Sequence, residues 1–214
     1  MGATMGASLT GQPHVVILGG GFAGMGAVQK LGDAEVRITL IDRNDYHTFQ
    51  PLLYQVATAE LGPEEVAYPL RELQRRHHHL TLHQDDVVKI DLANKKVTTR
   101  AVGDIGYDFL VIAMGSVVNF FGTEGAAEHA FPLYTMQDAL RVKNHLLKTY
   151  EAVDKQPELV QAGALNVCIV GGGPTGVEMA GALADLIFVE FRKDYPSVPI
   201  DQAQVMLFEH SPSL

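Results

Sequence analysis

The feature that most constrains the fold is a short glycine motif that occurs twice. Residues 14–24 read HVVILGGGFAG, and residues 166–176 read NVCIVGGGPTG. In both copies an apolar run leads into Gly-x-Gly-x-x-Gly, and the first glycines, Gly19 and Gly171, lie 152 positions apart. In a chain of 214 residues, this spacing indicates one module used twice rather than a solenoid of short repeats.

The first copy has the surroundings of a dinucleotide-binding loop. The apolar run before the glycines predicts a strand, and the pattern after them predicts a helix. In this context Gly19 permits a tight turn, Gly21 lets a pyrophosphate approach the backbone, and Gly24 lets helix and strand pack closely. The next apolar run ends at Asp42, whose carboxylate can accept hydrogen bonds from ribose hydroxyls. The alternative is a turn that needs glycine for steric reasons alone.

The second copy repeats this arrangement. Its glycines are Gly171, Gly173 and Gly176. Pro174 suits the first turn of a helix, and the apolar run 205–209 again ends in an acid, Glu209. A carboxylate at this position repels a 2′-phosphate, so the motif favours NAD(H) over NADP(H). Arg43 could contact such a phosphate at the first site, but Asp42 before it favours an unphosphorylated ribose.

Composition narrows the function classes. Apolar residues make up 47% of the chain and charged residues 19%, which is typical of a globular protein. With 16 Lys and Arg against 25 Asp and Glu, the net charge of −9 argues against a nucleic-acid partner. The single cysteine, Cys168, excludes a CxxC redox pair and a cysteine zinc site within the chain, and its apolar run predicts a buried residue. The low cysteine content favours an intracellular compartment.

Between the two copies the sequence predicts four further elements. They are a helix over 64–76, an antiparallel meander over 80–100 with a turn near Asn94, a strand over 107–113 buried on both faces, and a helix over 137–153 with Thr135 as its N-cap. No metal site is expected, because the imidazoles of 77–79 and the carboxylates of 85–86 are interpreted as solvated groups. Two dinucleotide sites in one chain imply electron transfer between two cofactors, one of them a flavin.

Four segments also resemble a known family. They are GGGFAG at 19–24, YHTFQPLLYQVATAEL at 46–61, YDFLVIAMGS at 107–116 and GGGPTGVEMAGALAD at 171–185. Together they resemble the type II NADH dehydrogenases, which are flavoprotein oxidoreductases with two dinucleotide-binding domains. The resemblance covers nearly the whole chain from residue 13 onward. The HTFQPLLYQVA segment is specific for this branch, whereas the glycine motifs alone would indicate only the superfamily.

The resemblance implies an α/β fold with two Rossmann-like dinucleotide-binding modules. The expected divisions are a disordered N-terminus at 1–12, an FAD-binding domain with a small antiparallel meander at 13–122, a connecting helix and linker at 123–162, and an incomplete NADH-binding domain at 163–214. The first glycine loop then holds FAD and the second holds NADH.

The resemblance also assigns residues to each cofactor. For FAD they are Gly19, Gly21, Phe22, Ala23, Gly24, Asp42, Arg43, His47, Gln50, Pro51, Leu52, Val87, Ala113 and Gly115. For NADH they are Gly171, Gly173, Pro174, Thr175, Gly176, Glu178 and Glu209. Met114 stands where the family has a threonine, which removes any hydroxyl contact there. Glu178 is the candidate catalytic residue near the flavin, nicotinamide and quinone; the alternative is a first-turn acid favoured by the helix dipole.

The function implied is electron transfer from NADH through FAD to a quinone in a respiratory chain, without proton pumping. The alternatives are a related flavoprotein reductase with another acceptor and an inactive nucleotide-binding fragment. Family members are roughly twice as long, so we expect an N-terminal part that is inactive alone and lacks the quinone-site and membrane-anchor segments. The intact protein is expected as a peripheral protein on the cytoplasmic face of a membrane, with a homodimer as a candidate assembly.

Overall fold

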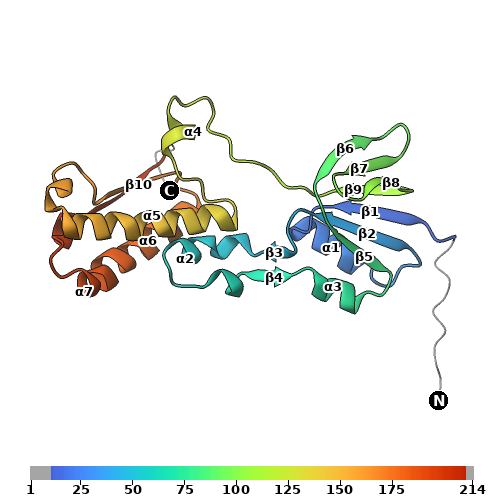
Figure 1. The fold of residues 1–214 in the computed structure, drawn as a ribbon, viewed down its shortest axis with the longest axis horizontal. Coiled ribbons are helices and arrows are strands. Elements are labelled where there is room, and N and C mark those ends of the chain that lie inside the picture. Colours follow the sequence, from blue (N-terminus) through green and yellow to red (C-terminus); the bar gives the residue numbers. More distant parts are fainter. Residues whose placement is uncertain (1–10, 211–214) are drawn as a thin grey trace, which may run out of the picture. The chain divides into compact units, whose positions relative to one another are not determined.

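The computed structural model describes residues 11–210, which fall into two compact units (Figure 1). The first unit runs up to Thr48 and continues over Ala67–Val117. The second unit contains Phe49–Val66 and the chain from Val118 onward. The first ten residues of the expected disordered N-terminus lie outside the described residues. The functional boundaries expected at residues 122 and 162 stay a prediction.

The first unit is built on a parallel sheet of four strands in the order β5-β2-β1-β9. The strands are β1 (His14–Leu18), β2 (Arg37–Asp42), β5 (Leu80–Gln84) and β9 (Phe109–Ile112). Helix α1 (Phe22–Lys30) covers one face, where Val28 packs with Ile17 and Leu40 in the core. Because Leu18 pairs with Ile41, the carboxyl ends of β1 and β2 lie side by side and present their following loops together.

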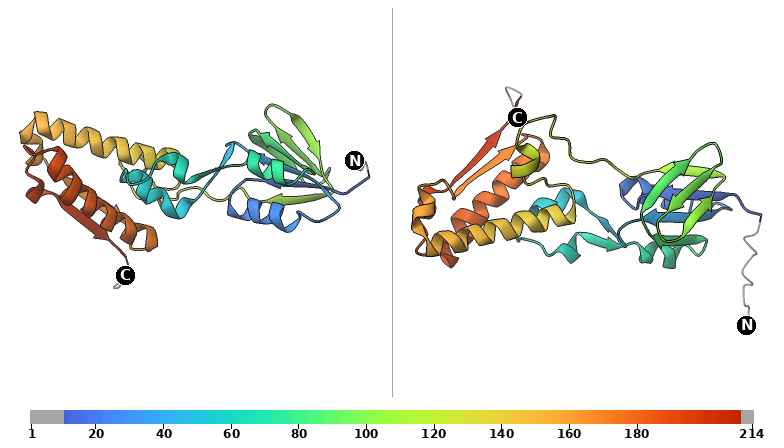
Figure 2. Two further views of the ribbon diagram at one scale, coloured as in Figure 1. Left: turned by 90° about the horizontal axis from the view of Figure 1, so that it is seen from below. Right: turned by 45° about the horizontal axis from the view of Figure 1, so that its top comes forward.

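A three-stranded antiparallel meander covers the other face of this sheet (Figure 2, left). Its strands are β6 (Val87–Asp91), β7 (Lys96–Thr99) and β8 (Gly103–Gly106). Buried Val97 packs against Val16 and Ile41 of the sheet. The predicted meander and its turn near Asn94 are confirmed, but both of its predicted ends are wrong, because its third strand β8 lies beyond residue 100. Residues 80–84 pair in parallel with β2, as β5 of the main sheet.

Two further sequence predictions, for residues 64–76 and 107–113, are wrong. The expected helix over 64–76 is instead a 3-10 turn η2 (Pro63–Glu65), a strand β4 (Ala67–Pro69) and a short helix α3 (Arg71–Arg76). Pro69 is the last residue of β4. A proline inside a helix clashes with the preceding turn and removes a hydrogen bond, so one helix could not continue across this position. Strand β4 pairs with β3 (Tyr46–Thr48).

Strand β9 was predicted to be buried on both faces. It pairs with β1 alone among the described strands, so it is an edge strand of the sheet. Phe109 at its start and Ile112 at its end are 61% and 57% exposed. The continuous apolar run therefore identified the strand correctly but did not reveal its place in the sheet.

The second unit contains a parallel pair of strands, β10 (Asn166–Val170) and β11 (Gln204–Phe208). Helix α6 (Pro174–Asp185) packs against both strands and runs into the π-helical turn η4 (Leu186–Phe191) and the short helix α7 (Arg192–Asp194). The long helix α5 (Met136–Lys155) packs with α2 (Leu53–Ala57). The remaining short elements are η1 (Gln50–Leu52), α4 (Ala126–His129), η3 (Pro157–Val160) and η5 (Ile200–Gln202).

Helix α5 begins where the sequence predicts. The Thr135 hydroxyl accepts a hydrogen bond from the Asp138 N–H, and the Asp138 carboxylate accepts one from the Thr135 N–H. This capping box satisfies N–H groups that the first helical turn leaves without partners. Buried Tyr150 of the same helix packs against Phe191 at the end of η4 and Tyr195 just after α7, which ties α5 to these two elements.

The prediction that Cys168 is buried is wrong. Alternate residues of β10 face α6, so Val167 and Ile169 are partly buried while Cys168 is exposed.

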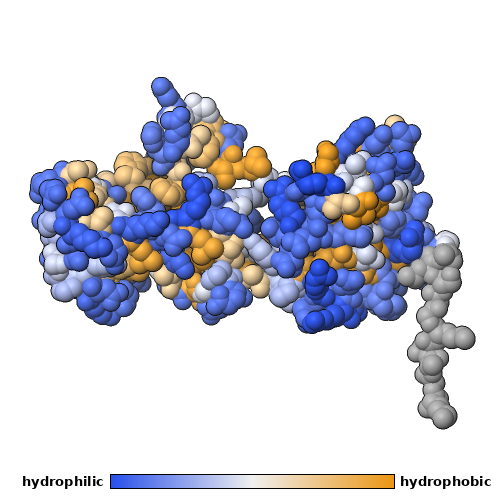
Figure 3. Space-filling view, in the orientation of Figure 1, coloured by the Kyte–Doolittle hydropathy of each residue, from blue (hydrophilic) through white to orange (hydrophobic). Residues whose placement is uncertain are grey.

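The surface is mostly hydrophilic, with scattered apolar patches (Figure 3). No helix within residues 11–210 is both long enough and apolar enough to cross a membrane.

Candidate functional site

The first glycine loop joins β1 to α1 and contains two glycines that the protein itself requires. Gly19 has a φ of +98°, and a Cβ there would lie 2.3 Å from the Ala113 carbonyl oxygen. A Cβ on Gly24 would lie 1.8 Å from the Gly19 carbonyl oxygen. These positions need glycine for the turn and for the close approach of α1 to the loop.

Gly21 is different, because nothing in the protein requires glycine there. Its backbone is extended, with φ −72° and ψ −169°, and a Cβ would meet no atom within 4 Å. It is the N-cap of α1, whose first turn contains no acidic residue. The N–H groups of a helix start and the positive end of its dipole favour an anion at this point. Glycine at this position leaves room for an external anionic group to approach the backbone.

Asp42 at the end of β2 lies against this loop, as the sequence predicts. Its Oδ2 accepts a hydrogen bond of 2.6 Å from the Gly20 N–H, and its Oδ1 accepts one of 2.7 Å from the Asn44 N–H. A carboxylate offers about four acceptor positions, so these two bonds leave capacity for ribose hydroxyls. The sequence analysis did not single out Gly20 or Asn44. Only Gly20 had a signal, the glycine in the middle of both motifs.

His47 lies beneath the same loop. The side chain is buried in strand β3, and its Nδ1 lies 3.1 Å from the Gly20 carbonyl oxygen. The ring packs edge-on against Phe22, with 4.7 Å between centroids. The structure thus places His47 against the backbone of the glycine loop.

The other residues assigned to FAD are distributed over both units. In the first unit, Ala23 is exposed in α1, Val87 packs against the sheet, and the Ala113 N–H donates to the Leu18 carbonyl next to the loop. Gly115 has the positive φ of +72° expected of the predicted turn.

Arg43 is exposed, with its Nε 3.8 Å from an Asp86 carboxylate oxygen. Gln50, Pro51 and Leu52 form η1 of the second unit, where the Gln50 side chain donates to the Tyr134 carbonyl oxygen. Contact of these four residues with a flavin stays a prediction.

The second glycine loop reproduces the geometry of the first. Gly171 has a φ of +109°, and a Cβ on Gly176 would lie 1.9 Å from the Gly171 carbonyl oxygen. Gly173 is the extended N-cap of α6, and a Cβ there would again meet nothing within 4 Å. Glu209 Oε2 accepts a hydrogen bond of 2.5 Å from the Gly172 N–H. The predicted carboxylate therefore lies at this loop too.

Three more predicted residues lie on α6. Pro174 occupies its first position, Thr175 is exposed beside it, and Glu178 is exposed further along. Glu178 lies beyond the first turn, which contains no acidic residue. The helix dipole acts mainly within that turn, so it gives little reason for an acid at this position.

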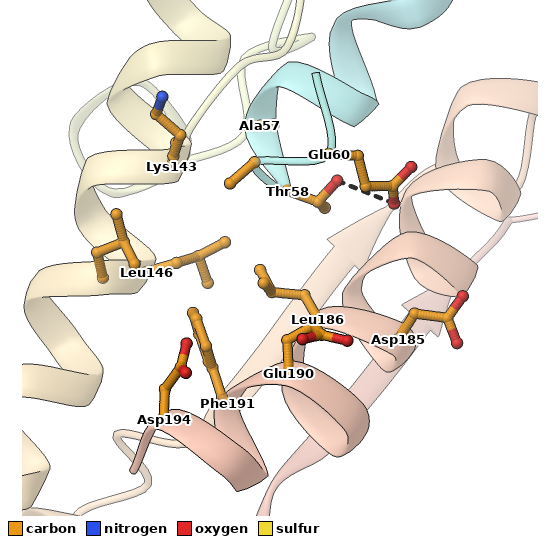
Figure 4. A pocket seen from close by; sticks show the side chains of 12 residues that line it. Ala57, Thr58, Glu60, Lys143, Leu146, Asp185, Leu186, Glu190, Phe191 and Asp194 are labelled. Carbon is orange, nitrogen blue, oxygen red and sulfur yellow. Dashed lines mark hydrogen bonds between the residues drawn. The ribbon is translucent and has the colours of Figure 1, made fainter. Parts of the chain in front are cut away.

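A cavity of about 470 Å³ lies elsewhere in the second unit (Figure 4). Leu146 of α5 and Leu186 and Phe191 of η4 converge on it, and the Thr58 hydroxyl near its rim donates to Glu60. Helix α6 has 12 residues and a length of about 18 Å, and the cavity lies at the end opposite Gly173. It is therefore separate from the second glycine loop.

Two sets of side chains are less solvated than the sequence suggests. His79 is only 9% exposed, whereas His78 is exposed. Asp85 is also buried, and its carboxylate accepts hydrogen bonds from Ala101 and Val102 N–H. The hydrogen bond with the Thr99 side chain, followed by those from the backbone, lowers the pKa of Asp85 to about 2. Within residues 11–210, no group of three or more His, Cys, Asp or Glu side chains is arranged to hold a metal ion.

Comparisons with known proteins identify the family to which the chain belongs. The family described as pyridine nucleotide-disulphide oxidoreductase matches residues 13–214. The chain belongs to this family. It is 36% identical over 214 residues to the type II NADH:quinone oxidoreductase Ndh of Mycobacterium tuberculosis, covering 96% of this chain and 46% of that protein. It is 32% identical to the mitochondrial external alternative NAD(P)H-ubiquinone oxidoreductase B1 of Arabidopsis thaliana, covering 86% of this chain and 34% of the relative.

Solved structures share the fold. The NDH2 of Plasmodium falciparum, solved in complex with NADH, superposes with a TM-score of 0.82 at 24% identity, over 92% of this chain and 41% of that one. The sulfide:quinone oxidoreductase of Aquifex aeolicus superposes with a TM-score of 0.72 at 25% identity, over 94% of this chain and 44% of that one. The predicted α/β fold and the resemblance to type II NADH dehydrogenases are confirmed. The chain spans about half, or less, of the length of these relatives.

Proposed function

We propose that this chain carries the FAD and NADH sites of an NADH:quinone oxidoreductase. One observation carries the proposal: both loops keep a glycine, Gly21 and Gly173, at an open helix start where the fold itself does not need one. A dinucleotide pyrophosphate is the anion that such a strand–glycine–helix unit binds. Two such units in one chain support a reaction between two dinucleotides.

We assign FAD to the first loop and NADH to the second. In this assignment the backbone at Gly21 binds the flavin pyrophosphate and Asp42 binds its ribose. Gly173 and Glu209 do the same for NADH, and the Glu209 charge repels the 2′-phosphate of NADPH. Bound at the first loop, FAD would supply the flavin chemistry that takes a hydride from NADH and passes its electrons on. The chain's own residues bind and orient both cofactors, and Glu178 is proposed to lie near their junction.

The electron acceptor and the location in the cell extend the same proposal. The quinone acceptor is inferred from the names of the relatives, which are NADH:quinone and NAD(P)H-ubiquinone oxidoreductases. The second candidate is a related flavoprotein reductase with another acceptor. For the intact protein we further propose an intracellular location, peripheral on the cytoplasmic face of a membrane, with a homodimer as the candidate assembly.

The proposal is tested by flavin content and flavin reduction. The purified chain is incubated with FAD, freed of excess cofactor and then titrated with NADH without oxygen. We expect a yellow protein that is bleached by NADH and less readily by NADPH. A colourless protein whose melting temperature still rises with NADH would instead support a nucleotide-binding chain without redox function. A chain that binds neither FAD nor NADH would refute the proposal.

A further inference from the structure

The peptide groups on both sides of Gly20 are held by side chains. The Gly20 N–H donates to Asp42 Oδ2 at 2.6 Å, and the Gly20 carbonyl oxygen lies 3.1 Å from His47 Nδ1. A carbonyl oxygen can only accept, so Nδ1 must carry the hydrogen and donate it. The middle of the first loop is therefore fixed from two sides.

His47 is itself held in place. It belongs to β3, where it pairs with Tyr68 of β4, and its side chain is only 7% exposed. Its ring meets that of Phe22 at an interplanar angle of 84°. Leu70, just after β4, also reaches the loop, since a Cβ on Gly20 would lie 2.5 Å from its Cδ1. The donor that reaches the Gly20 carbonyl is thus part of a packed segment.

This hydrogen bond determines the direction of the next N–H. The Gly20 carbonyl and the Gly21 N–H belong to one peptide group, and no peptide bond in the described chain is cis. In a trans peptide the C=O and N–H point in opposite directions. When the Gly20 carbonyl points to His47, the Gly21 N–H points away from it. Because both neighbouring residues are glycines, little else would prevent this peptide from rotating.

We propose that His47 is a positioning residue for the first nucleotide site. Its Nδ1–H holds the Gly20 carbonyl and so keeps the Gly21 N–H oriented for the anionic group that binds at the start of α1. The cofactor then binds a loop that is already in its binding conformation and does not have to order it. This inference rests on the proposed function, and it assigns His47 an action through the loop backbone rather than a contact with flavin.

Three variants separate the donor from the bulk of the ring. His47→Asn keeps an N–H close to the position of Nδ1, His47→Gln moves it further along the side chain, and His47→Phe keeps a ring without a donor. FAD affinity is measured for each by quenching of flavin fluorescence. We expect about a tenfold loss for His47→Phe and His47→Gln, the scale of one hydrogen bond, and recovery of most of it in His47→Asn.

NADH affinity at the second loop and the melting temperature of the cofactor-free protein serve as controls. Both should be unchanged in His47→Asn and His47→Gln, which covers the case in which His47→Phe does not fold. Equal FAD affinity in all variants, or equal losses in the Asn and Gln variants, would overturn the positioning role. A wild-type chain that binds NADH but no FAD would refute the FAD assignment, and this inference with it.

Discussion

The third glycine of each loop, Gly24 or Gly176, packs directly on the first, whereas the second glycine faces open space. Both kinds of position read simply as glycine in the sequence. The motif therefore predicted the loops, but a steric turn remained as an alternative explanation. The packing around each glycine separates the glycines that the fold needs from Gly21 and Gly173, which it does not need.

The acid at the end of the strand that follows each glycine loop and helix was predictable, because these features occur in the same order in both copies. Its hydrogen bond to the middle glycine was not, because residue spacing does not show which lone pairs are already used. Asp42 and Glu209 make that bond alike, to Gly20 and Gly172. Each carboxylate thus stabilises its own loop.

We predict that Glu209→Gln narrows the preference of the second site for NADH over NADPH. The amide keeps one acceptor oxygen but removes the charge that repels a 2′-phosphate. The ratio of the two dissociation constants, measured by nicotinamide fluorescence, should fall by about tenfold, the scale of one charged hydrogen bond. Glu158→Gln changes the net charge equally at an exposed position of η3 and should leave the ratio unchanged. An unchanged ratio in Glu209→Gln would contradict the assignment.

Among the elements, the meander depends on one buried acid. Asp85 accepts hydrogen bonds from the backbone of Asp86, Ala101 and Val102, and its pKa falls to about 2 from 3.8. A carboxyl group with a lowered pKa in the folded state stabilises the fold above its unfolded pKa. That contribution is lost as the pH falls through the folded value.

We therefore predict that acid destabilises the first unit between about pH 4 and pH 2 through Asp85, the interval between its unfolded and folded pKa values. Asp85→Asn should lower the melting temperature at neutral pH, because its amide hydrogens would face the N–H donors of Ala101 and Val102. It should also reduce the fall in melting temperature between about pH 4 and pH 2, which is measured by thermal denaturation at a series of pH values. Asp86→Asn is the matched control and should have little effect, because its pairs with Arg43 and Arg100 are exposed. A fall in melting temperature as large as that of the wild type in Asp85→Asn would show that Asp85 does not cause the acid destabilisation.

Element types were predicted best where a local signal marked a boundary. Thr135, recognised as an N-cap, identified the start of α5 from sequence alone. The segment 64–76 failed because its helical pattern continued across Pro69, which interrupts it. Residues 80–84 were assigned to the meander because a strand pattern does not specify its partner, and the partner is the distant strand β2.

At the scale of the whole molecule, apolar runs overstated burial. Cys168 and the ends of β9 lie in continuous apolar segments, yet they are exposed on the described sheets. On the outer face of β10 and β11, Val170 pairs with Phe208, and these are 88% and 52% exposed. A contiguous apolar face of this kind favours association with another surface.

We predict that the 214-residue chain self-associates through this face. Val170→Thr combined with Phe208→Thr should shift the sedimentation profile toward a smaller species. The measurement is made in a reductant, because exposed Cys168 on the same face could form disulfide-linked dimers. Val88→Thr alters an apolar residue of the first unit that is 61% exposed and should not change the profile. A wild-type chain that sediments as a monomer would contradict the prediction.

The most direct test of two separate dinucleotide sites is a crossed binding experiment with Gly21→Val and Gly173→Val. At neither position would a Cβ meet a protein atom within 4 Å, so both variants should fold and should differ from the wild type mainly in the space left for a pyrophosphate. Bound FAD and bound NADH are each quantified by equilibrium dialysis. The account predicts that Gly21→Val loses FAD and retains NADH, and that Gly173→Val loses NADH and retains FAD. Retention of FAD by Gly21→Val, or loss of both cofactors in either folded variant, would contradict it.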